Sequence, residues 1–437
     1  MDPKVTTEHP SDETSRKERS RTARAAHYAR RTMSRAWWER PLPSAEAFAG
    51  LCADVHDVVR CGPSGDEAGG GRGLFATAAV AKGATIFRES PAVLVQDPRN
   101  RAETRACGCC HAMLADTESS TARPSCAWGC GEKYCDETCE EKHVRELGHR
   151  VFCVGPLDSW DHPVAALRLE AARDDDQDGL LALVQEMAAR ILHETHAAIA
   201  REERSGDDAS VSASSDPETS AARVDAVVSA ALAAASLAWF ARGGEPEGSP
   251  LARASARCRE MSVLVANAAA AAIDDRENDR FGPSDAAAAT SASAKRRRTD
   301  TLRAAATRAF ETRGVSALAT LAMRNQLSVV VDSRGDHKPY DGVALFPLTC
   351  LMNHDCFPNA EVRFDDGVDG FDGCASDPPG TARAPRARVV ALRDVVAGEE
   401  LTHAYVDVAR PAQVRAAALA GFGFKCRCQR CARARGG

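Results

Sequence analysis

The sequence predicts an α+β protein in which short strands flank a long helical region. Residues 154–324 are predicted to be mostly helical, since apolar residues there repeat with a period of 3.6 residues: Leu180, Leu183, Val184, Met187 and Ile191. Short runs rich in Val, Ile and Phe, typical of strands, occur before residue 107 and again after residue 325. Eleven of the 17 cysteines gather in two segments, 107–153 and 426–431, which indicates metal-binding modules.

The N-terminal segment, residues 1–45, is expected to be disordered because it is charged and poor in aliphatic residues. It is rich in arginine, but the 10 Lys and Arg of residues 1–40 stand beside 6 Asp and Glu. This mixture, together with the net charge of −6 for the chain, argues against direct nucleic-acid binding. The chain has no run of 18 apolar residues, so we expect no transmembrane helix and no membrane partner.

Residues 46–106 are predicted to form short strands, among them Thr85–Phe87 and Ala92–Val95. The glycine-rich run Gly69–Gly73 allows a close approach of the backbone that side chains would block. Alone, this run is also compatible with a flexible hairpin.

Two low-complexity segments interrupt the helical region and are predicted to be flexible surface insertions. One is Ser205–Ala221, and the other is Asp274–Thr299, which ends with the basic run Lys295–Arg298. This run is compatible with a nuclear-import signal and equally with a solvated group of charges.

Strands are predicted again at Gln326–Val331, Arg388–Leu392 and Glu400–Tyr405, with a loop at Asp366–Ala384 and a short helix at Pro411–Ala420. Before the loop, the apolar run Val343–Leu348 indicates a buried segment. A polar stretch, Asn353–Ala360, follows it and contains an amide, an imidazole, a thiol and a Pro-Asn turn. Pro358 argues against a helix there, so we expect a bent loop of the kind that often carries chemistry.

Seven cysteines and one histidine lie within fewer than fifty residues, enough for two tetrahedral zinc sites. They form short-spaced pairs: Cys107 and Cys110, Cys126 and Cys130, Cys135 and Cys139, His149 and Cys153. The alternatives are buried free thiols or disulfides, but no signal peptide is recognisable, so zinc in a reducing compartment is favoured. Such closed sites would be structural. Near the end, Cys426, Cys428 and Cys431 offer three thiolates to a third zinc ion, which needs a fourth ligand.

Four segments in this order resemble the SET-domain protein lysine methyltransferases: Gly69–Thr77, Leu351–Ala360, Gly398–Asp407 and Phe422–Cys431. The Cys/His block between the first two resembles a MYND zinc module, so the arrangement resembles the SET-and-MYND family. The resemblance implies a β-rich SET domain in which the central loop threads the loop closed by the tail, a pseudoknot. It divides the chain into a SET N-terminal part (46–106), a MYND zinc finger (107–153), a helical insert (154–324), a SET core (325–410) and a post-SET zinc tail (411–437).

The resemblance also implies how the zinc ligands are grouped, because MYND modules interleave their ligand pairs. Site one would use Cys107, Cys110, Cys135 and Cys139; site two would use Cys126, Cys130, His149 and Cys153. Cys356 of the central loop would complete the third site, giving about three zinc ions per chain. His143 is the alternative to His149, and Cys109 is the alternative to Cys110.

The activity implied is methyl transfer from S-adenosylmethionine to a lysine amine. By resemblance, the cofactor contacts are Gly70, Gly71, Arg72, Asn325, Asn353, His354 and Phe424. Phe422 and Phe424 would wall the lysine channel, where an apolar, aromatic surrounding lowers the lysine pKa. Tyr405 would be the catalytic residue that orients the amine. Relatives often have Tyr at the position of Phe422 and Ser at that of Asp355.

The rival interpretation is a MYND-type adaptor that binds short peptides and whose SET domain is inactive. Tyr405, Asn353 and His354 together favour the enzyme. The expected partners are therefore a protein that carries the target lysine, histone or non-histone, and a peptide motif bound by the MYND module. The expected location is the nucleus, the cytoplasm or both.

Overall fold

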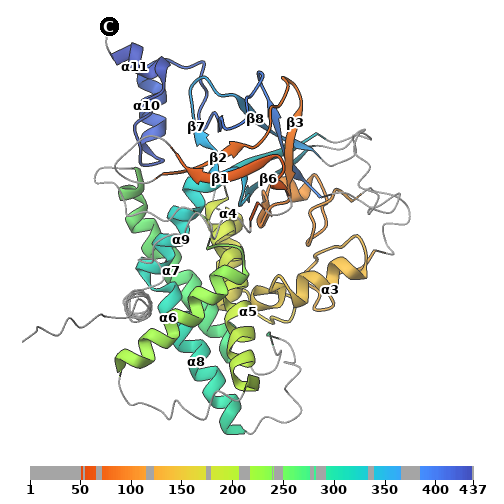
Figure 1. Ribbon diagram of the computed structural model, residues 1–437. Coiled ribbons are helices and arrows are strands. Elements are labelled where there is room, and N and C mark those ends of the chain that lie inside the picture. Colours follow the sequence, from red (N-terminus) through yellow and green to blue (C-terminus); the bar gives the residue numbers. More distant parts are fainter. Residues whose placement is uncertain are drawn as a thin grey trace, which may run out of the picture.

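The computed structural model describes residues 51–52, 55–64, 71–114, 123–173, 179–205, 217–238, 240, 250–275, 280–281, 292–332, 339–365 and 384–435. The disorder expected for residues 1–45, the contact expected of Gly70, and most of the loops expected at Ser205–Ala221 and Asp366–Ala384 lie outside these residues. The described part has strands gathered at one end and helices at the other (Figure 1). The α+β class is therefore confirmed.

In the part of the chain that the structure describes, the strands form three small sheets, and the first has the order β1-β2-β10-β7. Its strands are β1 (Val59–Pro63), β2 (Arg72–Ala76), β10 (Glu400–His403) and β7 (Asn353–His354). β7 runs parallel to β10, with Asn353 opposite Thr402 and His354 opposite His403. This pairing brings the central loop to the strand that precedes Tyr405.

The other two sheets are antiparallel, with orders β3-β9-β8 and β4-β6-β5. The strands are β3 (Thr85–Glu89), β9 (Arg386–Ala391), β8 (Ala360–Asp365), β4 (Val93–Gln96), β6 (Tyr340–Leu345) and β5 (Gln326–Val331). All the predicted strands occur, with one shorter than expected. β10 ends at His403, so Tyr405 lies just beyond the strand rather than in it.

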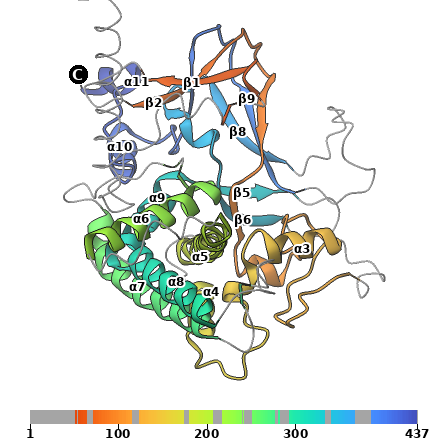
Figure 2. The ribbon, with the colours of Figure 1, turned by 60° about the horizontal axis from the view of Figure 1, so that its bottom comes forward.

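The described residues of the insert form six helices: α4 (Pro163–Arg173), α5 (Leu180–Ser205), α6 (Pro217–Ala234), α7 (Pro250–Asp274), α8 (Ala292–Phe310) and α9 (Thr312–Asn325). Helix α5 lies in the middle, packed against α4, α6, α8 and α9 (Figure 2). The five apolar residues whose spacing predicted a helix are all buried on α5. They belong to a core that continues to Val93 on β4 and Leu345 on β6.

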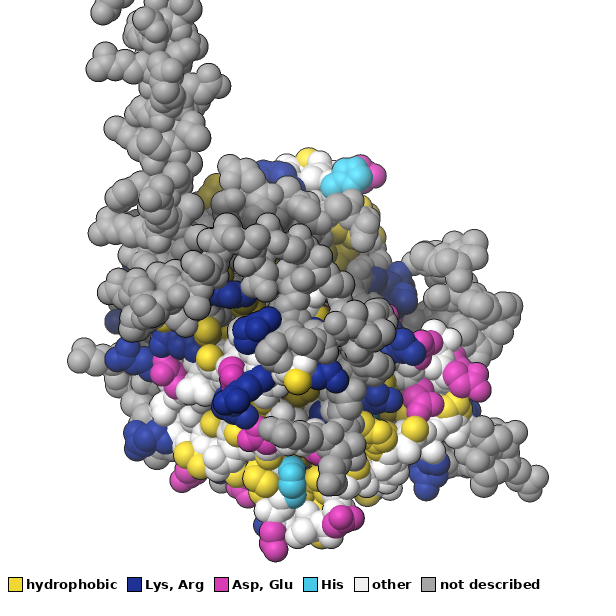
Figure 3. All heavy atoms as spheres, turned by 90° about the horizontal axis from the view of Figure 1, so that it is seen from below, with side chains coloured by type: hydrophobic (Ala, Val, Ile, Leu, Met, Phe, Trp, Pro, Cys, Tyr) yellow, Lys and Arg dark blue, Asp and Glu magenta, His cyan; other side chains and the backbone are white. Residues whose placement is uncertain are grey.

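The basic run Lys295–Arg298 lies in the first turns of α8, which corrects the expectation of one flexible insertion from Asp274 to Thr299. Within that range, α7 extends to Asp274 and α8 begins at Ala292. Ala, Lys and Arg are strong helix formers, so a composition that is low in complexity is here also helical. Seen from below, basic and acidic side chains are interspersed on the helical end of the molecule (Figure 3).

The cysteine-rich module, residues 107–114 and 123–153, contains α3 (Glu137–Arg145) and packs beside the start of α5 (Figure 2). Asp136 caps α3 by accepting the backbone N–H of Cys139 at 2.8 Å. Arg280 joins the module to the insert: its buried guanidinium donates to the carbonyl oxygen of Cys153 at 2.7 Å and pairs with Asp275 at 2.7 Å. Buried charge that is paired in this way fixes the module against the end of α7.

The chain closes with α10 (Ala412–Ala420) and α11 (Gln429–Arg435), which lie beside β1 and β2 (Figure 1). The short helix predicted at Pro411–Ala420 is therefore present. Across the described residues, every helix is too short or too polar to cross a membrane.

Candidate active site and metal centres

Asn353 ties together three segments that are far apart in the sequence. Its side-chain Nδ2 donates to the carbonyl oxygen of Arg72 at 2.8 Å and to Oε1 of Glu400 at 2.7 Å. The glycine-rich loop, the central loop and β10 therefore meet at one amide group. Two of the residues expected to contact the cofactor, Arg72 and Asn353, are brought together here.

Glu400 explains why Gly73 carries no side chain. A Cβ atom at Gly73 would lie 2.3 Å from Oε1 of Glu400, which is too close for any real contact. The other carboxylate oxygen of Glu400 accepts the hydroxyl of Ser64 at 3.0 Å. Glu400 thus anchors the N-terminal loop, a role that could not be predicted from the sequence because Ser64 lies 336 residues away.

His354 lies between Tyr405 and a candidate zinc ligand. Its Nδ1 accepts the backbone N–H of Tyr405 at 3.1 Å, and its Nε2 lies 3.2 Å from Sγ of Cys356. Burial lowers the pKa of His354, which favours the neutral imidazole. Because Nδ1 is an acceptor, the proton belongs on Nε2, where it points to the sulfur.

Tyr405 is the centre of an aromatic cluster. Its ring centroid lies 5.0 Å from that of Phe422, 4.9 Å from that of His403 and 6.1 Å from that of Phe424. Its hydroxyl donates to the carbonyl oxygen of Met352 at 2.8 Å. Burial, with smaller contributions from Cys350 and Glu400, raises the pKa of Tyr405, so the phenol stays protonated.

A pocket of about 390 Å³ opens beside this cluster. Tyr405, Phe422 and Asn325 line it, so three predicted site residues meet there. Phe424 does not line the pocket; it is 37% exposed and its ring lies 6.1 Å from the imidazole of His354. Its ring therefore lies near both His354 and Tyr405, outside the set of residues that line the cavity.

Asn325 lies where helix α9 meets strand β5. It is the last residue of α9, and its side chain donates to the carbonyl oxygen of Leu321 at 2.7 Å. The amide thereby satisfies a carbonyl near the end of the helix. The helical region expected to end at residue 324 and the strand expected from Gln326 are both present, and they meet here without an intervening turn.

The turn before the central loop contributes two further pocket residues, Thr349 and Cys350, which the sequence did not single out. Glu89 holds this turn by accepting the backbone N–H groups of Leu348 and Thr349 and the hydroxyl of Thr349. Burial raises the pKa of Glu89 to about 7, although these three donors oppose the shift. The signal available in the sequence was the position of Thr349 and Cys350, directly before Leu351 and the central loop.

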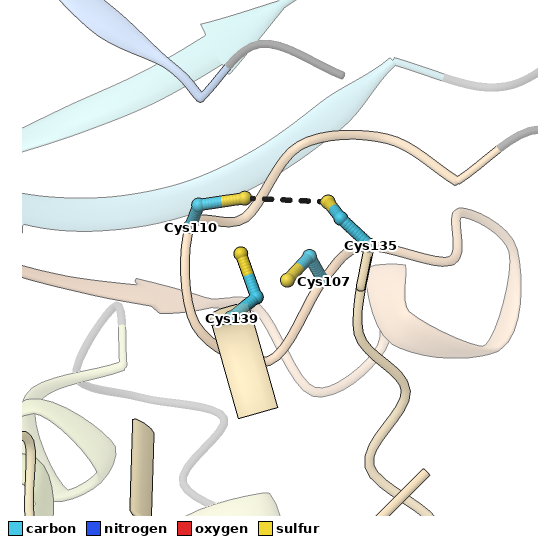
Figure 4. Close-up of side chains that lie close together, drawn as sticks. All are labelled: Cys107, Cys110, Cys135 and Cys139. Carbon is cyan, nitrogen blue, oxygen red and sulfur yellow. Dashed lines mark hydrogen bonds between the residues drawn. The ribbon is translucent and has the colours of Figure 1, made fainter. Parts of the chain in front are cut away.

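The first zinc ligand set is formed by Cys107, Cys110, Cys135 and Cys139, whose side chains converge on one point (Figure 4). The four sulfur atoms lie within 4.8 Å of one another. Cys109, the alternative to Cys110, is not part of this group. Four thiols at such distances fit a tetrahedral zinc ion.

The second set is Cys126, Cys130, His149 and Cys153. Nε2 of His149 lies 3.3 Å from Sγ of Cys126 and 3.5 Å from Sγ of Cys130. His143, the alternative ligand, is buried beside His149, but its Nδ1 lies 3.2 Å from the hydroxyl of Tyr134, outside the ligand group. The donor set of three sulfurs and one imidazole again fits zinc.

The third set joins the central loop to the tail: Cys356, Cys426, Cys428 and Cys431. Sγ of Cys356 lies 3.5 Å from that of Cys431 and 3.9 Å from that of Cys426. The backbone N–H of Cys431 points to Sγ of Cys428 at 3.5 Å, a contact common in zinc-binding turns. The three groups are the same as those that the resemblance implied.

Comparison with known proteins agrees with this geometry. Residues 71–406 match the SET domain family. Over 91 residues the chain is 36% identical to histone-lysine N-methyltransferase ATXR2 of Arabidopsis thaliana and 32% identical to histone-lysine N-methyltransferase SMYD3 of Homo sapiens. It is 31% identical over 101 residues to protein-lysine N-methyltransferase SMYD4 of Danio rerio. Each match covers 21% of this chain, and 16%, 17% and 13% of the respective relatives.

Proposed function

The chain belongs to the SET domain family, and on that premise we propose that it is a protein-lysine N-methyltransferase that uses S-adenosylmethionine. The substrates would be lysine side chains of histone or non-histone proteins. The observation that carries the proposal is the position of Tyr405, in a pocket with aromatic walls and hydrogen-bonded through its backbone to His354.

Of the residues that would hold the cofactor, Asn325 lines the pocket and His354 accepts the backbone N–H of Tyr405. We assign this role to Gly70, Gly71, Arg72, Asn353 and His354, together with Asn325 and Phe424. When bound, S-adenosylmethionine supplies an electrophilic methyl group. A backbone free of side chains at Gly71 and the polar amide of Asn353 suit the close packing of a polar ligand.

The pocket would prepare the lysine amine for attack. Phe422 and the ring of Tyr405 surround it with apolar surface, which disfavours the ammonium ion and lowers the lysine pKa. The neutral amine then has a free lone pair for the new N–C bond. Because methyl transfer is a direct displacement, the contribution of the protein is mainly position and electrostatics.

The hydroxyl of Tyr405 is suited to orient that amine as an acceptor. Its proton is already donated to the carbonyl oxygen of Met352, so the lone pairs of the hydroxyl oxygen remain available to accept a hydrogen bond. A neutral lysine amine has two N–H groups, and one of them can be donated to this oxygen. This arrangement leaves the nitrogen lone pair free to face the methyl group.

Zinc would have a structural role in this proposal, with about three ions per chain. All twelve ligands are assigned to closed four-ligand groups, which leave no position for a reacting water molecule. The third ion would link the tail, which carries Phe422 and Phe424, to the central loop.

The test is a labelled-methyl transfer assay on protein and peptide arrays, combined with calorimetry of S-adenosylmethionine binding. We expect cofactor binding and transfer to lysine. If zinc-loaded, folded protein fails to bind the cofactor, the adaptor with an inactive SET domain is the better description.

A further inference from the structure

Helix α10 buries an arginine where an apolar residue would be expected. Of its nine residues, Arg415 and Leu419 are the two buried ones. Arg415 is only 3% exposed, whereas its neighbour Val414 is 49% exposed. The helix thus turns a charged side chain inward and an apolar one outward, an arrangement that costs free energy unless the charge has a partner.

The guanidinium of Arg415 faces the third cysteine group. Its Nη2 lies 3.7 Å from Sγ of Cys431, and its Nη1 donates to the carbonyl oxygen of Arg410 at 2.5 Å. Its Nε is buried and has no hydrogen-bond partner within the described part of the chain. Two of the three nitrogens are therefore used, and one of those is directed at a candidate zinc ligand.

The charge of the third group explains a buried cation. Four thiolates around one Zn²⁺ carry a formal charge of −2, which is costly to remove from water. Two basic side chains nearby, Lys425 and Arg427, are exposed. A third, Arg430, donates to the carbonyl oxygen of Val408 at 2.7 Å rather than to a sulfur. Arg415 is buried, and its guanidinium contacts a sulfur of this group.

The same cluster supports the candidate active site. Leu419 packs with Cys356, Cys426 and Cys431, and the side chains of Tyr405 and Phe422 pack against them. The position of α10 is therefore coupled, through the sulfurs, to two walls of the pocket.

We propose that Arg415 is a positioning residue of the third zinc site, which neutralises part of its thiolate charge and holds α10 and the tail against the central loop. The proposal rests on the zinc ion of the proposed function, but not on methyl transfer.

The test compares two variants of Arg415 with a matched control. R415M keeps the length of the side chain without its charge, and R415K keeps the charge without the forked donors. The control is R410M, since the side chain of Arg410 is 68% exposed and its pair with Asp407 lies at the surface. Zinc content is measured by elemental analysis, and zinc release to a chelator is followed by absorbance.

We expect the full chain to hold three zinc ions and R415M to bind one of them about 10–100-fold more weakly, as is usual when a partner of a zinc ligand is lost, so that this ion passes to the chelator faster. The other two should leave at the parental rate, and R410M should match the parent. The rate of zinc release from R415K should be closer to that of the parent than to that of R415M, because lysine keeps the positive charge near the thiolates.

Parental release from R415M would overturn the proposal, as would R415K behaving like R415M, because shape rather than charge would then be responsible. A parent with only two zinc ions would overturn it as well. If R415M fails to fold, as judged by circular dichroism, cobalt-substituted R415Q decides, because glutamine removes the charge but remains polar. A shift of its thiolate-to-cobalt absorption relative to the parent supports the contact to Cys431, and an unshifted band contradicts it. Cofactor binding by the parent, measured separately, reports on the proposed enzyme and not on Arg415.

Discussion

The imidazole Nδ1 of His354 accepts the backbone N–H of Tyr405 at 3.1 Å, while Nε2 of the same ring lies 3.2 Å from Sγ of Cys356. One side chain thus links the proposed catalytic residue to a proposed zinc ligand. The parallel pairing of β7 with β10 produces this contact, since it places His354 opposite His403, two residues before Tyr405. Loss of the third zinc ion is therefore expected to disturb the active site.

Replacement of Cys356 with serine should remove that ion. C356S is expected to hold two zinc ions instead of three and to lose most of its methyl transfer, because a serine hydroxyl is a poor zinc ligand. Elemental analysis and a transfer assay check this. C109S is the matched control, since Cys109 lies in the module but outside every ligand group, and it should keep three. Three zinc ions in C356S would remove Cys356 from the ligand set.

Glu132 should be important for stability. Its carboxylate, 8% exposed, accepts from Arg101 at 2.7 Å and from Arg168 at 2.9 Å. Burial opposes ionisation, but these two guanidinium groups outweigh it and hold the pKa of Glu132 well below its ordinary value. E132Q is expected to lower the free energy of unfolding by about 2 kcal/mol, less than a fully buried pair because Arg101 is 38% exposed.

Urea unfolding at neutral pH measures this effect. E141Q is the control, because the pair of Glu141 with Arg145 is exposed at 63% and 73% and should contribute almost nothing. Equal losses in the two variants would show that the pairs of Glu132 are not a special support of the module.

His403 should make stability depend on pH. Burial, with a smaller effect of His354, lowers the pKa of His403 to about 4 from 6.5. As the pH falls below 6.5, the unfolded chain takes up a proton that the folded chain refuses, so the free energy of unfolding falls. Between pH 7.5 and 5, His403 should account for about 2 kcal/mol of this loss.

Urea unfolding of H403Q at the two pH values tests this. The variant should lose about 2 kcal/mol less than the parent on acidification. H56Q, at a histidine whose side chain is 71% exposed, should follow the parent. The same acid sensitivity in H403Q and the parent would mean that His403 titrates normally in the folded state.

Phe422 should influence how many methyl groups are added. It lines the pocket next to Tyr405 and has no hydroxyl, so one side of the amine is left without a hydrogen-bond partner. F422Y would add an oxygen that takes up space and holds the amine. Mass spectrometry of the products should show a shift towards fewer methyl groups per lysine, with F364Y, at another pocket phenylalanine, as the control. An unchanged product distribution would exclude Phe422 from this role.

The short-spaced cysteines and the strands were predictable because their patterns are local. Zinc ligands two to four residues apart mark their pairs directly. The segment Gln326–Val331 is rich in β-branched valines, which are typical of strands. The grouping of these pairs, and the choice of Cys356, came from the resemblance, since spacing alone does not say which pairs share an ion.

Long-range contacts between single side chains were not predictable. Arg280 meets the carbonyl of Cys153 across 127 positions, and Arg101 meets Glu132 across 31. Neither arginine has any periodicity or motif that distinguishes it from an exposed one. The buried face of α10 could not be predicted either, because the positions of its apolar residues do not indicate that the side chain of Arg415 points inward.

The most direct test of the proposed enzyme is the transfer rate of Y405F beside that of the parent. Phenylalanine nearly fills the same volume, so Y405F should fold, retain its zinc and bind S-adenosylmethionine with parental affinity. Loss of the oxygen that orients the amine should lower the transfer rate by about 10²–10³-fold, as for other preorganised hydrogen-bonding groups. Equal rates in Y405F and the parent, on the same substrate and at saturating cofactor, would contradict the role of Tyr405.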